Sequence, residues 1–209
     1  MKSAMQGNAN AQNYVGGAYA DGDGVDVDKE AAVEWLWKAA EQNQTAAIRK
    51  LRKLGGRGLD EFLECLDPDA DDMKWWKFQK IVSDAQRGDV QAIYDLGDAL
   101  FCGKCGAIEN ERASIKWYKM AAEKGHVIAQ KELGDIYSSD NTIEMDNNEA
   151  LKWYRMAAEQ GDGTAQYWCG DLLEHGDGVD HDIEEAKRWY RKAADNGDDD
   201  AKEALERLG

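Results

Sequence analysis

Apolar residues recur at helical spacing in several stretches of this 209-residue chain, and charged residues fill many of the positions between them. One stretch places its apolar residues at i, i+3, i+4, i+7 and i+8, namely Ala150, Trp153, Tyr154, Ala157 and Ala158. This spacing predicts a helix that buries one face and exposes the other to solvent. Gly161 follows the stretch, and because glycine adopts the left-handed conformation easily, we expect the helix to end there.

A second kind of helical stretch carries a glycine in its interior. Its two clearest copies, which lie 36 residues apart, are Ala129, Leu133, Gly134 and Tyr137, and Ala165, Cys169, Gly170 and Leu173. Glycine inside a helix costs about 1 kcal/mol relative to alanine, so its presence needs a reason. We expect that each of these glycines allows a paired helix to approach closely.

The chain repeats itself with a period of 36 residues. Pairs of adjacent alanines at 121–122, 157–158 and 193–194 keep this step, and so do the glycines at 125, 161 and 197. A period of this length fits one helical hairpin per unit. Such a hairpin cannot bury its apolar face alone, so we expect neighbouring units to stack and to share a core.

The repeated pattern, AQ...G...Y..G.GV..D...A..W..KAAE.G, resembles the Sel1-like repeat, a relative of the tetratricopeptide repeat. The first unit carries it in Ala11, Gly16, Tyr19, Gly22, Gly24, Val25, Trp35, Ala39 and Ala40. A further unit carries it in Ala92, Leu96, Gly97, Trp117, Ala121 and Ala122. The resemblance implies an all-α fold, a right-handed α-solenoid of stacked helix-turn-helix repeats.

We expect a single solenoid domain over residues 1–209. Its predicted parts are repeat 1 (7–42), a degenerate repeat with an insertion (43–87), repeat 3 (88–124), repeat 4 (125–160), repeat 5 (161–196) and a capping helix (197–209). The degenerate repeat contains the only proline, Pro68, and an acidic run at 67–72, after which a helix is expected to resume at Met73. The first residues match a helix end, so the chain is expected to begin on the last turn of a unit that it does not contain.

Negative charge is concentrated in the second half of the chain. Of the net charge of -16, residues 1–88 contribute 12 Lys/Arg and 15 Asp/Glu, or -3, and residues 89–209 contribute 14 and 27, or -13. Such a field repels nucleic-acid phosphates and anionic lipid and speeds association with a basic partner, although acidity also serves solubility. The basic run at 49–57 contains no aromatic residues that could stack on bases. We expect a protein or peptide partner of basic character, without nucleic-acid or membrane binding.

Apolar runs and cysteine spacing indicate where the protein is located and whether its thiols are free. No apolar run approaches the roughly 20 residues of a membrane helix, and the first residues lack the apolar core of a signal peptide. The cysteines show no regular spacing that would staple successive repeats, and they are Cys65, Cys102, Cys105 and Cys169. We therefore expect free thiols and a cytoplasmic location. A periplasmic or secreted location stays open if an N-terminal signal was removed.

Candidate catalytic and metal-binding residues are sparse. His126 follows a glycine that ends a helix, where we expect a structural role. The loop EHGDGVDHD gathers metal-ligand types, but the equivalent loop DGDGVDVD lacks histidine, and neither has the order of a calcium loop. Cys102 and Cys105 form one CxxC without the second pair that structural zinc usually needs, and its metal or redox role stays open. No serine has a lysine three residues later, as a penicillin-binding nucleophile requires. We expect no enzyme, cofactor or metal.

The resemblance to the tetratricopeptide fold also implies a binding surface, because there the first helix of each unit lines the concave face. The position after the helix glycine holds an aspartate in three units. In those units the residues three before the glycine are Tyr94, Lys131 and Tyr167, and those four after it are Phe101, Ser138 and Glu174. The expected contact residues are Asp98, Asp135, Asp171, Tyr94, Phe101, Tyr167, Lys131 and Glu174. Aromatic side chains beside carboxylates suit a basic or amphipathic peptide, with the alternative that the aspartates simply face solvent.

Three functional hypotheses follow. The first is a non-enzymatic adaptor or scaffold that binds a basic or amphipathic peptide or protein surface in its acidic concave groove. The second is an immunity or inhibitor protein that neutralises a bacterial toxin, because compact acidic repeats suit a cationic enzyme. The third is a metal-dependent or penicillin-binding hydrolase, for which the sequence offers no convincing pair of nucleophile and base. The sequence does not predict an oligomeric state.

Overall fold

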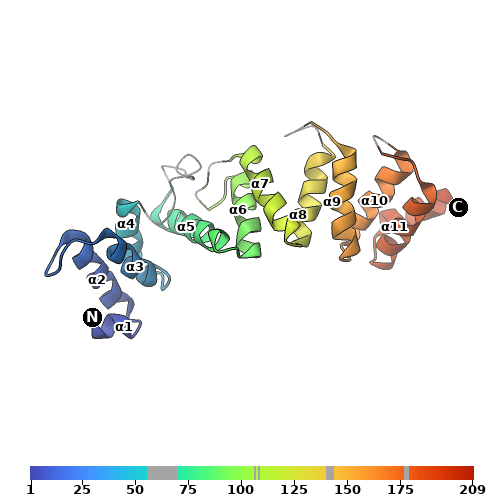
Figure 1. Cartoon of the computed structure of the whole chain (residues 1–209). Coiled ribbons are helices and arrows are strands. Elements are labelled where there is room, and N and C mark those ends of the chain that lie inside the picture. The colour runs from blue at the N-terminus through green and yellow to red at the C-terminus, as the bar shows by residue number, and fades with distance from the viewer. Residues whose placement is uncertain (56–69, 106, 108, 140–143, 177–178) are drawn as a thin grey trace. The chain divides into compact units, whose positions relative to one another are not determined.

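The computed structural model describes residues 1–55, 70–105, 107, 109–139, 144–176 and 179–209. They form α-helices with short connections, in two compact units, Met1–Asn110 and Glu111–Gly209 (Figure 1). The N-terminal unit contains α1 (Lys2–Met5), α2 (Ala9–Asp21), α3 (Lys29–Ala40), α4 (Thr45–Leu54), α5 (Asp72–Gln86) and α6 (Val90–Cys102). The C-terminal unit contains α7 (Glu111–Glu123), α8 (Val127–Tyr137), α9 (Asn147–Glu159), α10 (Gly163–His175), α11 (Ile183–Asp195) and α12 (Asp199–Leu208). None of the described helices is long and apolar enough to cross a membrane.

Within each unit, helices that follow one another along the chain pack side by side. In the N-terminal unit α2 packs on α3 and α5 on α6, and in the C-terminal unit α8, α9, α10, α11 and α12 pack in that order. The degenerate repeat joins this arrangement through α4 and α5, and α5 begins one residue before the predicted Met73. Trp76 of α5 meets Trp37 of α3 edge to face at 4.7 Å between ring centroids, in the core of that unit. The all-α repeat fold predicted from the sequence is confirmed.

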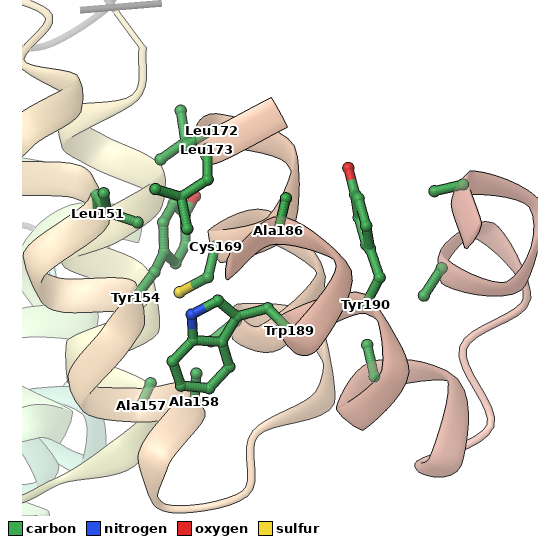
Figure 2. Packing of buried hydrophobic residues seen from close by; sticks show 14 of the residues in the cluster. Leu151, Tyr154, Ala157, Ala158, Cys169, Leu172, Leu173, Ala186, Trp189 and Tyr190 are labelled. Carbon is green, nitrogen blue, oxygen red and sulfur yellow. The ribbon is translucent and has the colours of Figure 1, made fainter. Parts of the chain in front are cut away.

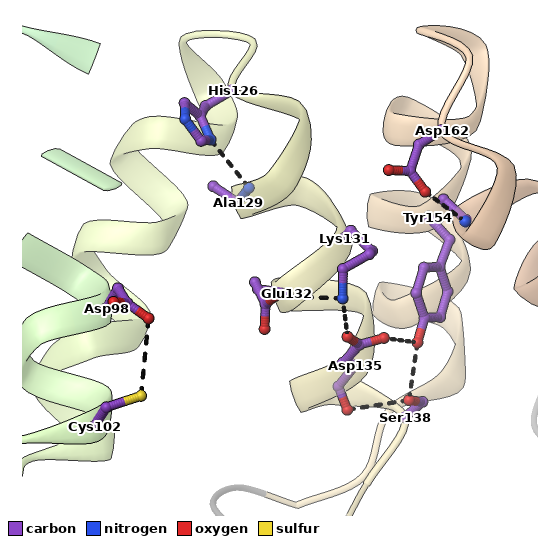
Figure 3. A network of polar contacts seen from close by, with 11 residues as sticks. Asp98, Cys102, His126, Ala129, Lys131, Glu132, Asp135, Ser138, Tyr154 and Asp162 are labelled. Atoms are coloured by element: carbon purple, nitrogen blue, oxygen red, sulfur yellow. Dashed lines mark hydrogen bonds and ion pairs between the residues drawn. The ribbon is translucent and has the colours of Figure 1, made fainter. Parts of the chain in front are cut away.

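Short polar side chains begin most of these helices. Each accepts a hydrogen bond from a backbone N–H of the first turn, and the capping carboxylates and amide are Asn8, Asp28, Asp71, Asp89, Asp146, Asp162, Asp182 and Asp198. His126 takes the same place in α8, where its Nδ1 accepts from the Ala129 N–H at 3.2 Å (Figure 3). A carboxylate at this position also interacts favourably with the positive N-terminal end of the helix dipole. Part of the chain's negative charge therefore serves its helices.

A large side chain from the following helix packs directly against each of the glycines inside α2, α8 and α10. A Cβ atom on Gly134 would lie 2.4 Å from the Tyr154 ring, and one on Gly170 would lie 2.8 Å from the Tyr190 ring. In α2 the corresponding Gly16 faces Leu36, whose Cγ would be 2.6 Å away. Such distances exclude any larger residue unless the helices move apart. The predicted close approach of paired helices is confirmed.

The core of the C-terminal unit is built from the side chains that these glycines admit. Tyr154 and Tyr190 are fully buried, and Cys169 of α10 lies in the same cluster together with Trp189 (Figure 2). Burial raises the pKa of the Cys169 thiol, so the thiol stays protonated and contributes to the core only by packing. Alanines of α9 and α11 complete the cluster because they let neighbouring helices come close. Repeats 4 and 5 thus both contribute aromatic rings to one shared core.

A buried glutamine ties three successive helices together in repeats 1, 4 and 5, whereas repeat 3 has Ile93 at that position. The Gln166 side chain donates to the Ala158 carbonyl at 3.0 Å and accepts from the Asn196 amide at 2.8 Å. Gln130 repeats both contacts, to the Ala122 carbonyl at 2.9 Å and from Gln160 at 2.7 Å, and Gln12 does the same in the N-terminal unit. Sequence reasoning noted this glutamine in the repeat pattern without assigning it a role. Removing it would break two partly or fully buried hydrogen bonds between helices, each of which contributes about 0.5–1.5 kcal/mol.

We predict opposite effects for two neighbouring glycines of α2. Gly16→Ala should lower the free energy of unfolding by about 1–3 kcal/mol, because its methyl group collides with Leu36 and the backbone of α3. Gly17→Ala meets only the flexible end of Lys50 and should raise it by up to about 1 kcal/mol through helix propensity. Urea unfolding followed by tryptophan fluorescence measures both. Equal effects at the two positions would contradict the proposed role of Gly16.

Candidate functional site

The three aspartates that follow a helix glycine each lie within ion-pair distance of a lysine or histidine side chain of the same unit. Asp98 lies in α6 of the N-terminal unit, and its carboxylate pairs with Lys104 at 3.1 Å. Asp135 and Asp171 lie in α8 and α10 of the C-terminal unit, where they pair with lysine and histidine respectively. The predicted row of carboxylates is therefore partly neutralised from within the chain. Because only Asp135 and Asp171 belong to the same unit, the candidate site is confined to the C-terminal unit.

Asp135 is the centre of a closed hydrogen-bond network (Figure 3). It accepts from Lys131 at 2.5 Å and from the Tyr154 hydroxyl at 2.7 Å, and that hydroxyl also lies 3.3 Å from Ser138 Oγ. Burial alone would lower the pKa of Lys131, but the carboxylates of Asp135 and Glu132 outweigh it and the pKa is raised. Lys131 therefore stays charged, and the predicted contact residues Lys131 and Asp135 largely satisfy each other.

Glu174 differs from the exposed groove residue that the sequence suggested. Its side chain is only 6% exposed, and it accepts from the Tyr190 hydroxyl at 2.8 Å and from both terminal nitrogens of Arg207. Arg207 comes from α12, so this carboxylate fastens the last helix to α10 and α11. Burial alone would raise the pKa of Glu174, but the hydrogen bonds from Arg207 and Tyr190 outweigh it and lower the pKa. Glu174 thus has a structural role, and its buried carboxylate oxygens are already hydrogen bonded within the chain rather than exposed to a partner.

Asp171 is left in a different state from Asp135, although both follow the helix glycine. Its side chain is 27% exposed, and its Oδ1 lies 3.4 Å from His175 Nδ1, which is hydrogen bonded at 2.9 Å to the Asp171 carbonyl oxygen. Among the residues that the structure describes, none donates a hydrogen bond to the Asp171 carboxylate. Burial and the nearby Glu174 raise the pKa of Asp171, while His175 and Arg207 oppose that shift. This carboxylate is half-buried and still has its acceptor capacity available.

A pocket of about 610 Å³ opens beside Asp171. It lies between the end of α8, the start of α9 and the second half of α10, and its lining residues are Ser138, Met145, Asn147, Tyr154, Trp168, Asp171, Leu172, His175 and Gly176. We call it the Trp168 pocket. The Trp168 indole is 39% exposed and stacks on Tyr154 at 6.4 Å between centroids, with the ring planes 18° apart. An exposed aromatic surface and an available carboxylate therefore share one cavity.

Trp168 was absent from the predicted contact residues, whereas Tyr167 was among them. The two rings meet edge to face at 5.3 Å, and Tyr167 is partly buried against Tyr190. The sequence does hold a signal for Trp168, because the equivalent position two residues before the glycine carries Asp95 and Glu132 in the two preceding units. The first unit has Tyr14 there, so Trp168 departs from two of the three other copies.

The remaining sequence candidates lie elsewhere. Tyr94 and Phe101 are partly exposed on α6 of the N-terminal unit, which also carries Cys102, whose Sγ lies 3.8 Å from Asp98 Oδ1. Cys102 and Cys105 are not bonded to each other, while Cys65 lies outside the described residues. The loop that contains His175 and His181 is described only in part, because residues 177–178 lie outside the described residues. Among the described residues, no group of three His, Cys, Asp or Glu side chains could hold a metal ion.

Comparison with known proteins adds a family. The family model for the Sel1 repeat matches residues 9–44, 90–126, 127–162 and 163–198, each starting two residues after the corresponding predicted repeat. No protein with a curated function matches the chain. The structure is similar to a protective antigen with an SLR fold from uropathogenic Escherichia coli strains, at 32% identity and a TM-score of 0.60. That match covers 98% of this chain and 42% of the antigen, so the chain spans less than half the length of that protein.

Two further structures complete the comparison. A Sel1 repeat protein from Oxalobacter formigenes is 37% identical with a TM-score of 0.58, over 63% of this chain and 98% of that one. An immunity protein from Pseudomonas aeruginosa is 16% identical with a TM-score of 0.44, over 93% of this chain and 70% of that one. A likeness as weak as this second one gives no support to the hypothesis of an immunity protein.

We predict that the Glu174 contacts make the C-terminal unit sensitive to acid. A folded-state pKa below the usual 4.5 contributes stability that is present at higher pH and lost as pH falls through that lowered pKa. Glu174→Gln should therefore lower the free energy of unfolding by about 1–3 kcal/mol near neutral pH, and the difference from the wild type should shrink in acid. Urea unfolding over this pH range measures it, with Glu203→Gln as an exposed control. A difference that is constant with pH would contradict the assignment.

Proposed function

The chain belongs to the Sel1 repeat family, and from that premise we propose that it is a non-catalytic module that binds a basic segment of a partner protein at the Trp168 pocket. Sel1 repeat proteins generally bind other proteins and are generally not enzymes. The finer part of the proposal, the basic partner and its site, rests on the pocket. The single observation that carries it is the combination of an exposed indole with a half-buried carboxylate that accepts no hydrogen bond from the described residues.

Two physical properties support a basic partner. A half-buried carboxylate without hydrogen-bond donors has a desolvation cost that an incoming cation with N–H groups would offset. Tryptophan is enriched among the residues that dominate binding energy in protein interfaces, where one ring offers a large rigid surface. The net charge of -13 on residues 89–209 would also draw a basic segment toward this region and speed its association.

The proposed surface is smaller than the eight-residue groove suggested by the sequence. Asp171 and Trp168 line the pocket and form the centre of this surface, and Tyr167 lies beside it in edge-to-face contact with Trp168. Glu174 and Asp135 chiefly hold neighbouring helices in place, and the charge of Lys131 is compensated by Asp135. Asp98, Tyr94 and Phe101 are proposed as a second, separate contact surface, on α6 of the N-terminal unit.

We predict that basic peptides bind this pocket and that two substitutions weaken them. A labelled peptide rich in Arg and Lys should bind in fluorescence anisotropy, and one in which Glu replaces these residues should not. Asp171→Asn and Trp168→Ala should each reduce the affinity about tenfold or more, which corresponds to about 1.4 kcal/mol. Asp171→Asn should also flatten the salt dependence, because one close charge pair is lost.

Matched controls keep this test specific. Glu203→Gln removes the same charge from an exposed position of α12, and Ile128→Ala removes an exposed apolar side chain from the far end of α8. Both should bind like the wild type. Equal binding of basic and acidic peptides, or full affinity of both pocket variants, would refute the proposed function.

A further inference from the structure

The walls of the Trp168 pocket differ in chemistry in a way that discriminates between cations. One side is aromatic, with Trp168 and Tyr154 nearly parallel, and another is the Asp171 carboxylate. Met145 and Leu172 add apolar surface, and Met145 is 48% exposed. A cation that enters this cavity therefore meets a flat π surface, a carboxylate and a hydrocarbon wall together. A volume of about 610 Å³ leaves room for one long side chain and part of its backbone.

From this arrangement we propose that the pocket selects an arginine side chain of the partner over a lysine, an inference that rests on the proposed function. The guanidinium group is planar and weakly hydrated, so it can stack on the exposed indole of Trp168. Its fork of N–H donors matches the geometry of a carboxylate such as Asp171. The ammonium group of lysine is compact and strongly hydrated, and it would lose more solvation for a single point contact.

The state of Asp171 gives the proposal its second support. Asp98, Asp135 and Glu174 each accept hydrogen bonds from side chains of this chain, from Lys104, from Lys131 and Tyr154, and from Arg207 and Tyr190. Asp171 accepts none from the described residues, and the neighbouring His175 ring, 3.4 Å from its Oδ1, donates to a backbone carbonyl instead. Glu174 already shows how this region receives a guanidinium, since Arg207 contacts both of its oxygens. The carboxylate of Asp171 is therefore available to bind the guanidinium group of a partner's arginine.

The experiment uses the full chain and three short probes. The probes are acetylated, amidated pentapeptides of alanine with a central arginine, lysine or citrulline, and citrulline keeps the shape of arginine without its charge. Binding is followed by the NMR signal of the Trp168 indole N–H, assigned by its loss in Trp168→Phe. The arginine peptide should shift this signal saturably, with a Kd at least about fivefold lower than the lysine peptide. The citrulline peptide should leave it in place.

Variants separate stacking from charge. Asp171→Asn should remove most of the preference for arginine, and Glu203→Gln should preserve it. Equal affinity for the arginine and lysine peptides would overturn the selectivity while leaving the proposed function intact. A longer basic peptide that binds without shifting the Trp168 signal would overturn the pocket as its site. Failure of every basic peptide to bind would refute the proposed function as well.

Discussion

The contact between a helix glycine and the tyrosine ring of the next helix determines most of what this structure can do. Because Gly134 has no Cβ atom, Tyr154 lies flat against α8, and this position brings its hydroxyl to Asp135 and its ring under Trp168. Gly170 places Tyr190 in the same way against α10. A packing constraint of the repeat therefore also positions the polar groups at the surface above it.

The two tyrosines differ in the acceptor that they choose, and the candidate site depends on that difference. Tyr154 donates to Asp135, which follows the glycine directly, whereas Tyr190 donates to Glu174, four residues after its glycine. The equivalent of Glu174 in the preceding repeat is Ser138, whose uncharged hydroxyl lies 3.3 Å from the Tyr154 hydroxyl, while the Asp135 carboxylate accepts from it at 2.7 Å. Glu174 thus satisfies Tyr190 and Arg207 together and leaves Asp171 with its acceptor capacity open. The presence of Glu174 in place of a serine thus explains why Asp171 has an available carboxylate while Asp135 has a structural role.

Much of the fold could be predicted from the sequence, because stacking requirements repeat every 36 residues and leave a visible pattern. The helix stops, the interior glycines and the capping helix all follow from local physical chemistry. The buried role of Glu174 could not be predicted, because it depends on Arg207 of a different helix, 33 residues later. The glutamine contacts were missed for a related reason, since Gln166 looks like any polar residue until helices on both sides are placed. Trp168 differs from Asp95 and Glu132 at the equivalent position, but its contribution to a pocket depends on the Tyr154 ring against which it stacks.

We infer that Glu174 accepts the hydrogen bond of the Tyr190 hydroxyl and thereby leaves the Asp171 carboxylate available as an acceptor for a ligand. A crystal structure of Glu174→Ser tests it most directly, because this change gives the last repeat the residue that its predecessor has at Ser138. In this variant the Tyr190 hydroxyl should donate to Asp171 at about 2.7 Å, as Tyr154 does to Asp135. A Tyr190 hydroxyl that ignores Asp171 in this variant, with the Asp171 carboxylate still without a donor, would contradict it.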